Sequence, residues 1–312
     1  MTVQETGYNS YGRFLKEKFG TRVHKVPVNA GFTCPNRDGT VAYGGCTYCS
    51  IDSFTPKAAS ARIPIKQQVQ TGIEFLKKRN GAQAFIVYFQ PYSNTYASLE
   101  HLQRLYEQAL DHPEVVGISV GTRPDCIDEA KLNYFEQLSQ NYFVTIEYGI
   151  ESVYDETLAL INRGHDYACT ARAIEATARR GLNVCGHVIL GFPNETEQQM
   201  LDMASAVSNL PLSFLKIHNL YVARYTKMAR EYLENPFPIL TFAEWVNLVC
   251  CFLERLSPNI IIERLYGNAP RDLLIAPQWC REGSRVINAI QQELKRRKAY
   301  QGRLFEETKR VF

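Results

Sequence analysis

The sequence lacks any apolar run long enough to cross a lipid bilayer. Its densest apolar stretch, Leu248 to Leu253, is far shorter than the roughly 18 residues that a membrane span requires. The N-terminal segment MTVQETGYNSYG contains neither the basic part nor the apolar part of a secretory signal. The nine cysteines are an odd number and follow no such signal, so they indicate a reducing compartment rather than a set of disulfide bonds. We therefore expect a cytoplasmic protein with no membrane partner.

The sequence also lacks internal repeats, low-complexity segments and a strong excess of one charge. Its formal net charge of +3 over 312 residues is too small to identify a polyanionic partner. Hydrophobic residues make up 45% and charged residues 21%, which is typical of a globular chain with a sizeable core. The length fits one large domain with extensions. We expect an N-terminal helical segment over residues 1–21, a core over residues 22–221 and a C-terminal extension over residues 222–312.

One loop concentrates the unusual residues of the chain. The segment GFTCPNRDGTVAYGGCTYCS, residues 31–50, contains Cys34, Cys46 and Cys49 at the spacing C-x11-C-x2-C. Its glycines, together with a proline, an asparagine and an aspartate, exclude a helix or a strand and predict a loop that folds back on itself. Glycine lets a backbone approach a bound group closely, because no Cβ stands in the way. The loop is therefore suited to wrapping a metal centre.

Three thiols are one fewer than a closed metal site needs. A structural zinc ion has four protein ligands, and an ordinary [4Fe–4S] cluster has four cysteines. A cluster held by Cys34, Cys46 and Cys49 would leave one iron open, as catalytic metal sites do. A zinc knuckle or a set of reduced structural thiols is the alternative. Cys250 and Cys251 are adjacent on an apolar helical run and the other cysteines are dispersed, so we expect no second cluster.

Beyond this loop, strands and helices alternate along the chain. Such alternation predicts an α/β fold with parallel strands, here a partial TIM-like (β/α)6 barrel followed by an α-rich C-terminal extension. The cysteine loop follows the first strand, so it should lie at the C-terminal face of the barrel, where functional residues gather. The predicted strands are Arg22–Val28, Ala84–Phe89, Val115–Val120, Phe143–Tyr148, Val184–Leu190 and Phe214–Tyr221.

Motifs at the strand ends carry a resemblance to a known family. They are CTYC at residues 46–49, GTRPD at 121–125, IEYGIES at 146–152, LINRGH at 160–165 and HVILGFPNET at 187–196. Together they resemble the radical S-adenosylmethionine (SAM) superfamily. With the long cysteine interval and YGNAPR at residues 266–271, the sequence is most similar to the YhcC/YtqA-like branch, which is related to the elongator-type radical SAM proteins. The resemblance covers about residues 22–221.

The resemblance implies a [4Fe–4S] cluster on Cys34, Cys46 and Cys49, with SAM as the second cofactor. The family binds the SAM amine through G-G-E after the second strand, and this sequence has QPYSNT there. That departure leaves three candidates for the amine's partner. We expect SAM to contact the following residues: Tyr48 near the adenine, Gln90, Ser93 or Asn94 at the amine, Glu147 and Glu151 at the ribose or the sulfonium side, and Ile189 and Gly191 beside the adenine. The sequence assigns no catalytic residue.

The resemblance implies an enzyme that cleaves SAM to a 5′-deoxyadenosyl radical and abstracts a substrate hydrogen. For this branch it points to tRNA, with conversion of a carboxymethylaminomethyl group on the wobble uridine to an aminomethyl group. It also implies an electron donor such as flavodoxin or ferredoxin. Two alternatives remain: a radical SAM enzyme acting on a small metabolite or a protein, and a non-catalytic, zinc-stabilised RNA-binding protein.

A basic run near the C-terminus has two interpretations. Lys295, Arg296, Arg297 and Lys298 end a predicted helix over residues 279–299. Such a run is usually a solvated face that favours a helix C-terminus, and it is also suited to contact phosphates. Further cations that could contact RNA are Lys57, Arg62, Arg123, Arg163, Arg303, Lys309 and Arg310.

Overall fold

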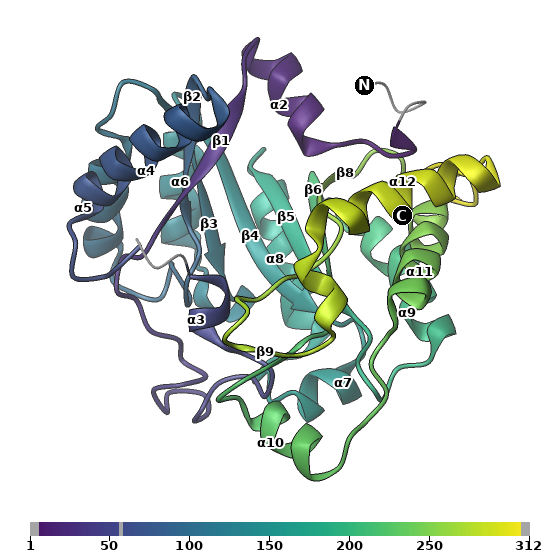
Figure 1. Cartoon of the computed structure of the whole chain (residues 1–312). Coiled ribbons are helices and arrows are strands. Elements are labelled where there is room, and N and C mark those ends of the chain that lie inside the picture. The colour runs from purple at the N-terminus through teal and green to yellow at the C-terminus, as the bar shows by residue number, and fades with distance from the viewer. Residues whose placement is uncertain (1–5, 56–58, 307–312) are drawn as a thin grey trace.

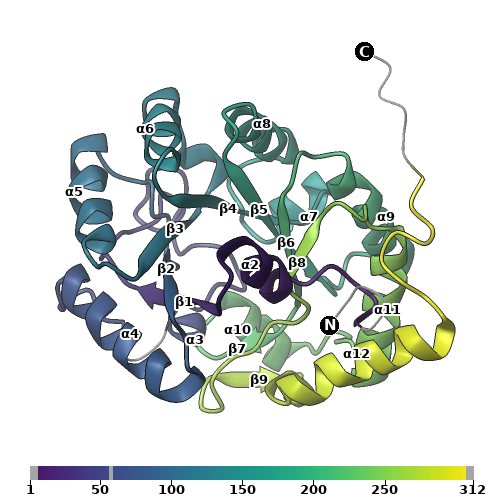
Figure 2. The ribbon, with the colours of Figure 1, turned by 90° about the horizontal axis from the view of Figure 1, so that it is seen from above.

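The computed structural model describes residues 6–55 and 59–306. Its centre is a sheet of seven parallel strands in the order β1-β2-β3-β4-β5-β6-β8, which curves into a half-barrel (Figures 1 and 2). The predicted partial barrel and its six strands are confirmed, and β8 adds a seventh strand from the C-terminal part of the chain. The strands are β1 (Val23–Val28), β2 (Ala84–Phe89), β3 (Val115–Thr122), β4 (Phe143–Glu151), β5 (Asn183–Leu190), β6 (Phe214–Asn219) and β8 (Ile261–Arg264).

Helices join successive strands and form the outer layer, as Figure 2 shows for α4, α5, α6 and α8. Parallel neighbours require crossover connections of this kind. The connecting helices are α3 (Ile51–Phe54), α4 (Ile65–Asn80), α5 (Leu99–Leu110), η1 (Pro124–Cys126), α6 (Glu129–Ser139), α7 (Asp155–Leu160), α8 (Tyr167–Ala178) and α9 (Glu197–Ser208).

Local sequence explains where these elements begin. All six positions of β2 are buried, because helices cover one face of the sheet and the barrel interior covers the other. Several connecting helices begin at capping side chains that accept a hydrogen bond from a backbone N–H three residues on, whereas α4 follows Pro64 and has no side-chain cap. Ser98 caps α5, Asp128 caps α6 and Asp166 caps α8.

An N-terminal helix, α2 (Tyr11–Phe19), packs at the end of the barrel where the strands begin. The Tyr11 ring contacts the Phe214 ring edge-on at 4.9 Å, and the Phe19 ring contacts the Phe143 ring edge-on at 5.7 Å. The chain just before the helix also pairs with β8, where the Ile262 N–H donates to the Asn9 carbonyl at 2.7 Å. The N-terminal segment thus covers the bottom of the barrel and leaves the opposite end for the cysteine loop.

The C-terminal part of the chain adds helices beside the barrel and one strand to its sheet. Helix α11 packs against α9 and α12. The sequence predicted one helix over residues 279–299, but η2 and α12 are separate. The Trp279 ring stacks on Trp245 at 5.8 Å, and its indole N–H donates to the Leu240 carbonyl. These contacts hold η2 separately from α12. The elements are β7 (Val222–Ala223), α10 (Lys227–Glu234), α11 (Phe242–Arg255), β9 (Leu274–Ala276), η2 (Gln278–Arg281) and α12 (Gly283–Arg297).

The basic run at the end of α12 lies far from the cysteine loop. Just beyond the run, the Gln301 amide donates to the Ser257 and Ile260 carbonyls, which precede β8 and so mark the N-terminal end of the strands. Figure 1 shows the end of α12 on the same side as α2. Arg296 and Arg297 both pair with Glu293 at 2.7 and 2.6 Å. Lys57, Lys309 and Arg310 lie outside the described residues.

Candidate active site

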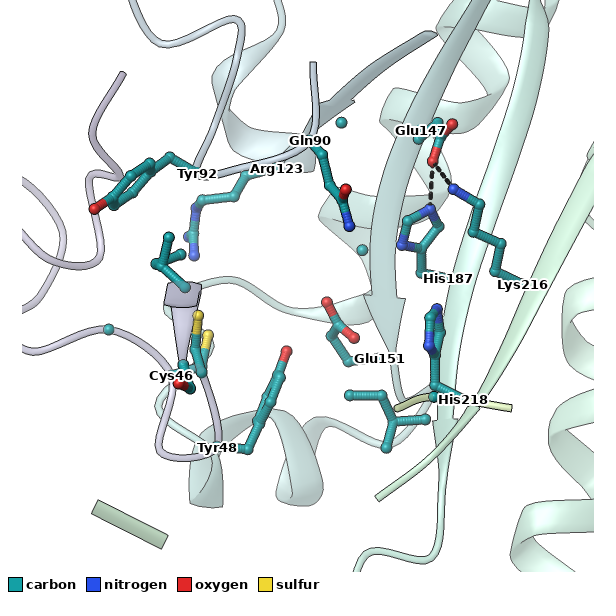
Figure 3. A pocket seen from close by; sticks show the side chains of 18 of the residues that line it. Cys46, Tyr48, Gln90, Tyr92, Arg123, Glu147, Glu151, His187, Lys216 and His218 are labelled. Atoms are coloured by element: carbon teal, nitrogen blue, oxygen red, sulfur yellow. Dashed lines mark hydrogen bonds and ion pairs between the residues drawn. The ribbon is translucent and has the colours of Figure 1, made fainter. Parts of the chain in front are cut away.

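A cavity of about 220 Å³ opens where the strands end. The three cysteines of the loop line one part of it, and side chains from β2, β4, β5, β6 and β8 line the rest. Figure 3 shows Cys46 and Tyr48 on one side and Glu147, His187, Lys216 and His218 on the other. Six of the eight residues predicted to contact SAM line this cavity: Tyr48, Gln90, Ser93, Glu147, Glu151 and Ile189.

The long interval between the first two cysteines forms a compact loop that folds back on itself. The Arg37 N–H donates to the Cys34 carbonyl at 2.8 Å, and the Gly45 N–H donates to the Asn36 carbonyl at 2.7 Å. An antiparallel bridge joins Asp38 to Tyr43 between these bonds. The interval therefore returns on itself, and Cys34 and Cys46 line the same cavity although eleven residues separate them.

Two buried donors reach the sulfur of Cys46. The Asn36 amide lies 3.6 Å from the sulfur and the Arg163 guanidinium lies 3.7 Å from it. Arg163 also donates to the Gly149 carbonyl at 2.6 Å and pairs with Glu151 at 3.7 Å. The LINRGH motif thus places a positive charge beside a cysteine sulfur, because its arginine is held between the loop and the end of β4.

The GTRPD motif positions this arginine. Arg123 binds both oxygens of Asp125, at 2.8 and 2.7 Å, and its remaining terminal nitrogen donates to the Arg163 carbonyl at 2.8 Å. Arg123 is 3% exposed and Arg163 is 6% exposed, so neither presents a guanidinium to an RNA backbone. Both cations act on the loop and the strand ends instead.

Glu151 ends β4 in a strained conformation. Its φ is +63°, a region that residues with a side chain seldom occupy, and the pairing of β4 with β5 shifts register at this point. A Cβ at Gly149 would lie 2.2 Å from a Glu151 carboxylate oxygen, so a larger residue there would displace that carboxylate. Strain of this kind is retained where surrounding structure fixes a functional side chain. Figure 3 shows the Glu151 carboxylate directed into the cavity.

Tyr48 and Ile189 form an apolar wall. The Tyr48 ring contacts the Phe192 ring edge-on at 6.1 Å, in a cluster that includes Ile189 and Leu220. Burial raises the pKa of the Tyr48 hydroxyl, so the phenol stays neutral. Gly191, which was also predicted to contact SAM, does not line the cavity. Its φ of +103° turns the chain after β5.

The segment after β2 presents polar groups of Gln90 and Ser93 to the cavity. The Gln90 side chain lines the cavity and points into it in Figure 3, and it makes no hydrogen bond to any described residue. Ser93 lines the cavity as well. Asn94 does not: it is fully buried, and its amide donates to the Phe89 and Gly121 carbonyls at 3.1 and 2.8 Å. Asn94 therefore ties the ends of β2 and β3 together.

Glu147 lies at the centre of a charged network in the barrel interior. Its carboxylate accepts hydrogen bonds from Lys25 at 2.6 Å, from His187 at 2.7 Å, and from Lys216 and Ser119. The His187 Nε2 carries the proton in this bond, because an ionised carboxylate is only an acceptor. Both oxygens are occupied, so the structure does not leave Glu147 free to bind a ribose hydroxyl as predicted from the sequence.

A second carboxylate completes this network. Glu263 pairs with Lys25 at 2.6 Å and with Lys216 at 3.0 Å. Burial would raise the pKa of Glu147, but the ammonium groups of Lys216 and Lys25 outweigh it and hold that pKa well below its usual value. Burial would lower the pKa of Lys25, but Glu147 and Glu263 raise it instead. Glu147 and Glu263 likewise raise the pKa of Lys216 against the effect of burial, so Glu147 and both lysines are charged at neutral pH.

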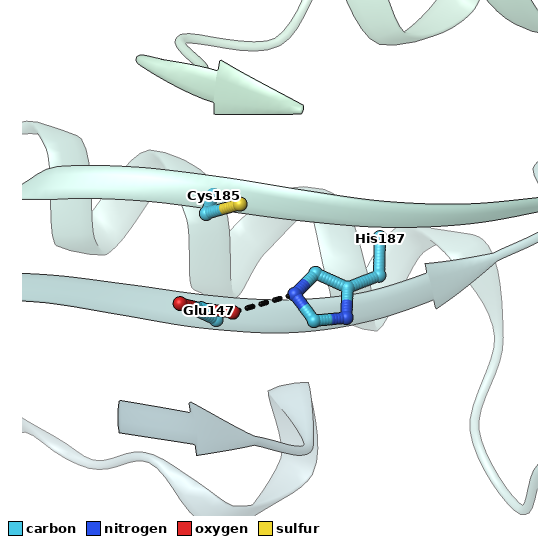
Figure 4. Close-up of side chains that lie close together, drawn as sticks. All are labelled: Glu147, Cys185 and His187. Carbon is cyan, nitrogen blue, oxygen red and sulfur yellow. Dashed lines mark hydrogen bonds and ion pairs between the residues drawn. The ribbon is translucent and has the colours of Figure 1, made fainter. Parts of the chain in front are cut away.

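One group in this region has the spacing of metal ligands. Glu147, Cys185 and His187 each offer a ligand atom, and these atoms lie within 4.8 Å of one another (Figure 4). However, two ammonium groups already occupy the carboxylate and would repel a cation. Burial, and then the charge of Glu147, raise the pKa of the Cys185 thiol well above its usual value, so it stays protonated. We therefore assign no metal to these three residues.

Sequence reasoning did not identify several groups that shape the cavity. Lys25, Lys216 and Arg264 were not singled out. A lysine in the middle of an apolar strand, as in FLKIHN at residues 214–219, is a signal that could have shown them. Few lysines are buried unless they are paired.

The comparison with protein families now identifies the class. The chain matches the family described as Radical SAM superfamily over residues 31–207, and the Radical_SAM C-terminal domain over residues 212–296. The first match covers more than half of the chain. The protein belongs to the radical SAM superfamily.

Individual relatives agree with this membership. The chain is 36% identical over 302 residues to uncharacterized protein YtqA of Bacillus subtilis (strain 168), covering 97% of this chain and 94% of YtqA. It is 27% identical over 181 residues to the tRNA uridine(34) acetyltransferase of Methanocaldococcus infernus, covering 57% of this chain and 33% of that protein. A structure of the archaeal Methanocaldococcus infernus Elp3 has a TM-score of 0.69 at 16% identity and covers 89% of this chain and 64% of that one, which shows a shared fold.

The cofactors of this superfamily, and of this protein, are a [4Fe–4S] cluster and SAM. The residues present fit the cluster. Cys34, Cys46 and Cys49 are free thiols that line one cavity, and Asn36 and Arg163 direct N–H groups at one of the sulfurs. Such bonds to sulfur tune a cluster's reduction potential.

No helix among the described residues is long and apolar enough to cross a membrane.

Proposed function

We propose that this radical SAM enzyme modifies the wobble uridine of tRNA, converting a carboxymethylaminomethyl group to an aminomethyl group. When bound, the cluster supplies the electron that cleaves SAM to methionine and a 5′-deoxyadenosyl radical, which takes a hydrogen atom from a substrate carbon. We assign Cys34, Cys46 and Cys49 to the cluster.

The net reaction balances with SAM as the oxidant. The bond between the amine nitrogen and the methylene carbon of the carboxymethyl group breaks, water supplies one oxygen atom, and the two carbons leave as glyoxylate. The two electrons that the substrate loses reduce SAM to methionine and 5′-deoxyadenosine, and one proton is released. The single electron that starts the reaction would be returned at its end, so it does not enter this balance. A one-electron donor such as flavodoxin or ferredoxin is needed to bring the cluster to its reduced state.

The side chains of the cavity divide into roles around SAM. We assign the Gln90 amide, which has no protein partner, to the amino-acid end of SAM, with Ser93 beside it. Glu151 is placed to accept hydrogen bonds from ribose hydroxyls. Tyr48 and Ile189 supply apolar contact for the adenine.

The main support for RNA as the substrate comes from exposed aromatic side chains on and beside the cysteine loop. Tyr225 is 91% exposed and Tyr43 is 80% exposed. Tyr43 belongs to the cysteine loop, and the helix that follows Tyr225 is bonded to that loop, since the Met228 N–H donates to the Thr47 carbonyl at 2.9 Å. Unstacked bases of single-stranded RNA bind to aromatic faces of this kind.

Charge and relatives support the same choice. Tyr225 is flanked by Arg224, Lys227 and Arg230, which are all exposed and suited to contact phosphates. The tRNA uridine(34) acetyltransferase named above acts, by its name, on the nucleoside that we propose as the substrate.

Mass analysis of tRNA nucleosides from a deletion strain tests the proposal. We expect carboxymethylaminomethyluridine derivatives to accumulate, and the unaltered gene but not a Cys46→Ala variant to restore the aminomethyl derivatives. An unchanged nucleoside profile would contradict the proposal and favour a small metabolite or a protein as the substrate.

Binding of purified tRNA provides a second test. Tyr225→Ala should weaken tRNA binding by about tenfold or more, because stacking contributes roughly 1–3 kcal/mol per base. The matched control is Tyr300→Ala, which removes an exposed tyrosine beyond α12, at the opposite end of the barrel. Equal affinities for the two variants would refute the stacking role.

A further inference from the structure

The part of the cavity opposite to the cysteines is lined by basic side chains. Figure 3 shows His187, Lys216 and His218 there, across the cavity from Cys46. Arg264, at the end of β8, lines the same cavity. Of these side chains, His187 begins the HVILGFPNET motif, whereas Lys216, His218 and Arg264 lie outside the motifs that carry the family resemblance.

The two lysines of this region are already neutralised. The Lys216 ammonium donates to Glu147 and to the Tyr88 hydroxyl, the latter at 3.2 Å, and pairs with Glu263 at 3.0 Å, so its charge is shared by two carboxylates. Lys25 pairs with the same two carboxylates. Two lysines and two glutamates balance one another in charge. Arg264 therefore adds a positive charge that this network does not compensate.

Arg264 has no protein acceptor for its charge. Its guanidinium makes no hydrogen bond and no ion pair with any residue in the described part of the chain, although it offers five N–H donors. A cation that lines a cavity is seldom left without a hydrogen-bond or ion-pair partner unless a bound ligand provides one. The remaining oxygen of Glu263 also lacks a hydrogen-bond partner, but its carboxylate is already shared by two ammonium groups.

His218 provides a second unsatisfied group beside Arg264. Its Nε2 is buried and has no hydrogen-bond partner. Burial, followed by the charges of Arg264 and other neighbours, holds the pKa of His218 well below its usual value, so the ring is neutral and can donate one hydrogen bond. A guanidinium and an imidazole N–H on adjacent strands, β8 and β6, form a site for a planar anion.

We propose that Arg264 and His218 form a subsite that binds a carboxylate of the substrate, and so hold the carbon next to it in the cavity. The inference deepens the proposed function, on which the identity of that carboxylate rests. The carboxymethylaminomethyl group ends in a carboxylate, and the methylene carbon that loses hydrogen is bonded to it. Anchoring the carboxylate at Arg264 would therefore position that methylene. Arg264 and His218 are positioning residues in this arrangement.

Binding of a small probe tests the subsite without tRNA. The probe is N-methylglycine, which has a carboxylate one carbon from a secondary amine, and binding is measured calorimetrically on the cluster-containing protein saturated with SAM and without reductant. We expect N-methylglycine to bind and N-methylglycinamide, which lacks the carboxylate, not to bind. Arg264→Gln should weaken binding by about tenfold to a hundredfold, as expected for loss of a charge-assisted contact.

A matched variant and a competing anion complete the experiment. Arg271→Gln removes an exposed arginine seven residues further on, outside the cavity, and should bind the probe as the unaltered protein does. Inorganic phosphate should bind more weakly than N-methylglycine, and tighter binding of phosphate would overturn the assignment to a carboxylate. Failure of the unaltered protein to bind N-methylglycine, or equal binding by Arg264→Gln, would also overturn it.

Affinity for SAM separates this subsite from one that serves the cofactor. Arg264→Gln should change the affinity for SAM and the uncoupled formation of 5′-deoxyadenosine by less than about twofold, and should abolish substrate conversion. A loss of SAM affinity as large as the loss of probe affinity would assign Arg264 to the carboxylate of SAM and overturn the inference. If the probe results hold while the tRNA nucleosides of a deletion strain are unchanged, the subsite stands and the tRNA substrate fails.

Discussion

Glu147→Gln should destabilise the protein strongly, because it unbalances a buried charge network. The Glu147 side chain has no exposed surface and accepts hydrogen bonds from four donors, two of them ammonium groups. The amide of glutamine keeps the size but removes the charge and turns an N–H₂ group towards a lysine. Two buried lysines would then share Glu263 alone.

The expected magnitude follows from this geometry. Removing one partner of a buried ion pair costs about 3–5 kcal/mol. An unfolding entropy of about 2.1 cal/mol/K per residue makes each kcal/mol worth roughly 1.5 °C in Tm for a chain of this length. The variant should therefore melt about 5–8 °C lower than the unaltered protein in near-UV circular dichroism at one scan rate. The matched control is Glu293→Gln, which removes a partly exposed carboxylate paired with Arg296 and Arg297 at the protein surface and should cost less than about 1 kcal/mol.

A second substitution and a change of pH distinguish charge balance from simple loss of packing. Lys216→Met removes one ammonium, so the double variant with Glu147→Gln should be more stable than the sum of the two losses by about 0.5–3 kcal/mol. The pKa of Glu147 is lower in the folded than in the unfolded protein. Its contribution to the free energy of unfolding is therefore fully present above the unfolded pKa of about 4.3 and is lost as the pH falls through the folded pKa. The difference in Tm should shrink below about pH 4. A loss as small as that of the control, independent of pH, would refute the reasoning.

Three further outcomes are expected. Cys46→Ala should lose the brown absorbance and 5′-deoxyadenosine formation, whereas Cys250→Ala should keep both; normal iron in the first variant would exclude Cys46 as a ligand. Gln90→Leu should retain the cluster and bind SAM about tenfold more weakly by equilibrium dialysis, since a hydrogen bond to a charged group is lost; unchanged affinity would remove Gln90 from the site. Changing the run 295–298 to Gln should leave tRNA affinity and its dependence on salt unaltered, because the run lies at the end of the barrel away from the cavity; a shallower dependence on salt would contradict this placement.

Much of the fold could be predicted because its signals are local. Apolar strands alternate with amphipathic helices, and several helices begin at a residue suited to cap them, such as Ser98 or Asp166. The position of the cysteine loop followed from the parallel order of the strands. The seventh strand was harder to place, because β8 is only four residues long and pairs with β6 across two helices.

The interior of the site was harder to predict, because its contacts join residues far apart in the sequence. Lys25 and Glu147 are 122 residues apart, and Glu147 and Lys216 are 69 residues apart. Only the register of the sheet brings them together, so the sequence suggested a ribose contact for Glu147 where the structure has an ion network. Asn94 likewise looked like a ligand, although its amide satisfies two carbonyls at the strand ends.

Anaerobic purification followed by incubation with SAM and a strong reductant tests the central claim most directly. The account predicts a brown protein with about four iron and four sulfide per chain, which forms methionine and 5′-deoxyadenosine only when Cys34, Cys46 and Cys49 are all present. A colourless protein that carries one zinc ion, has neither iron nor sulfide and leaves SAM intact would contradict it.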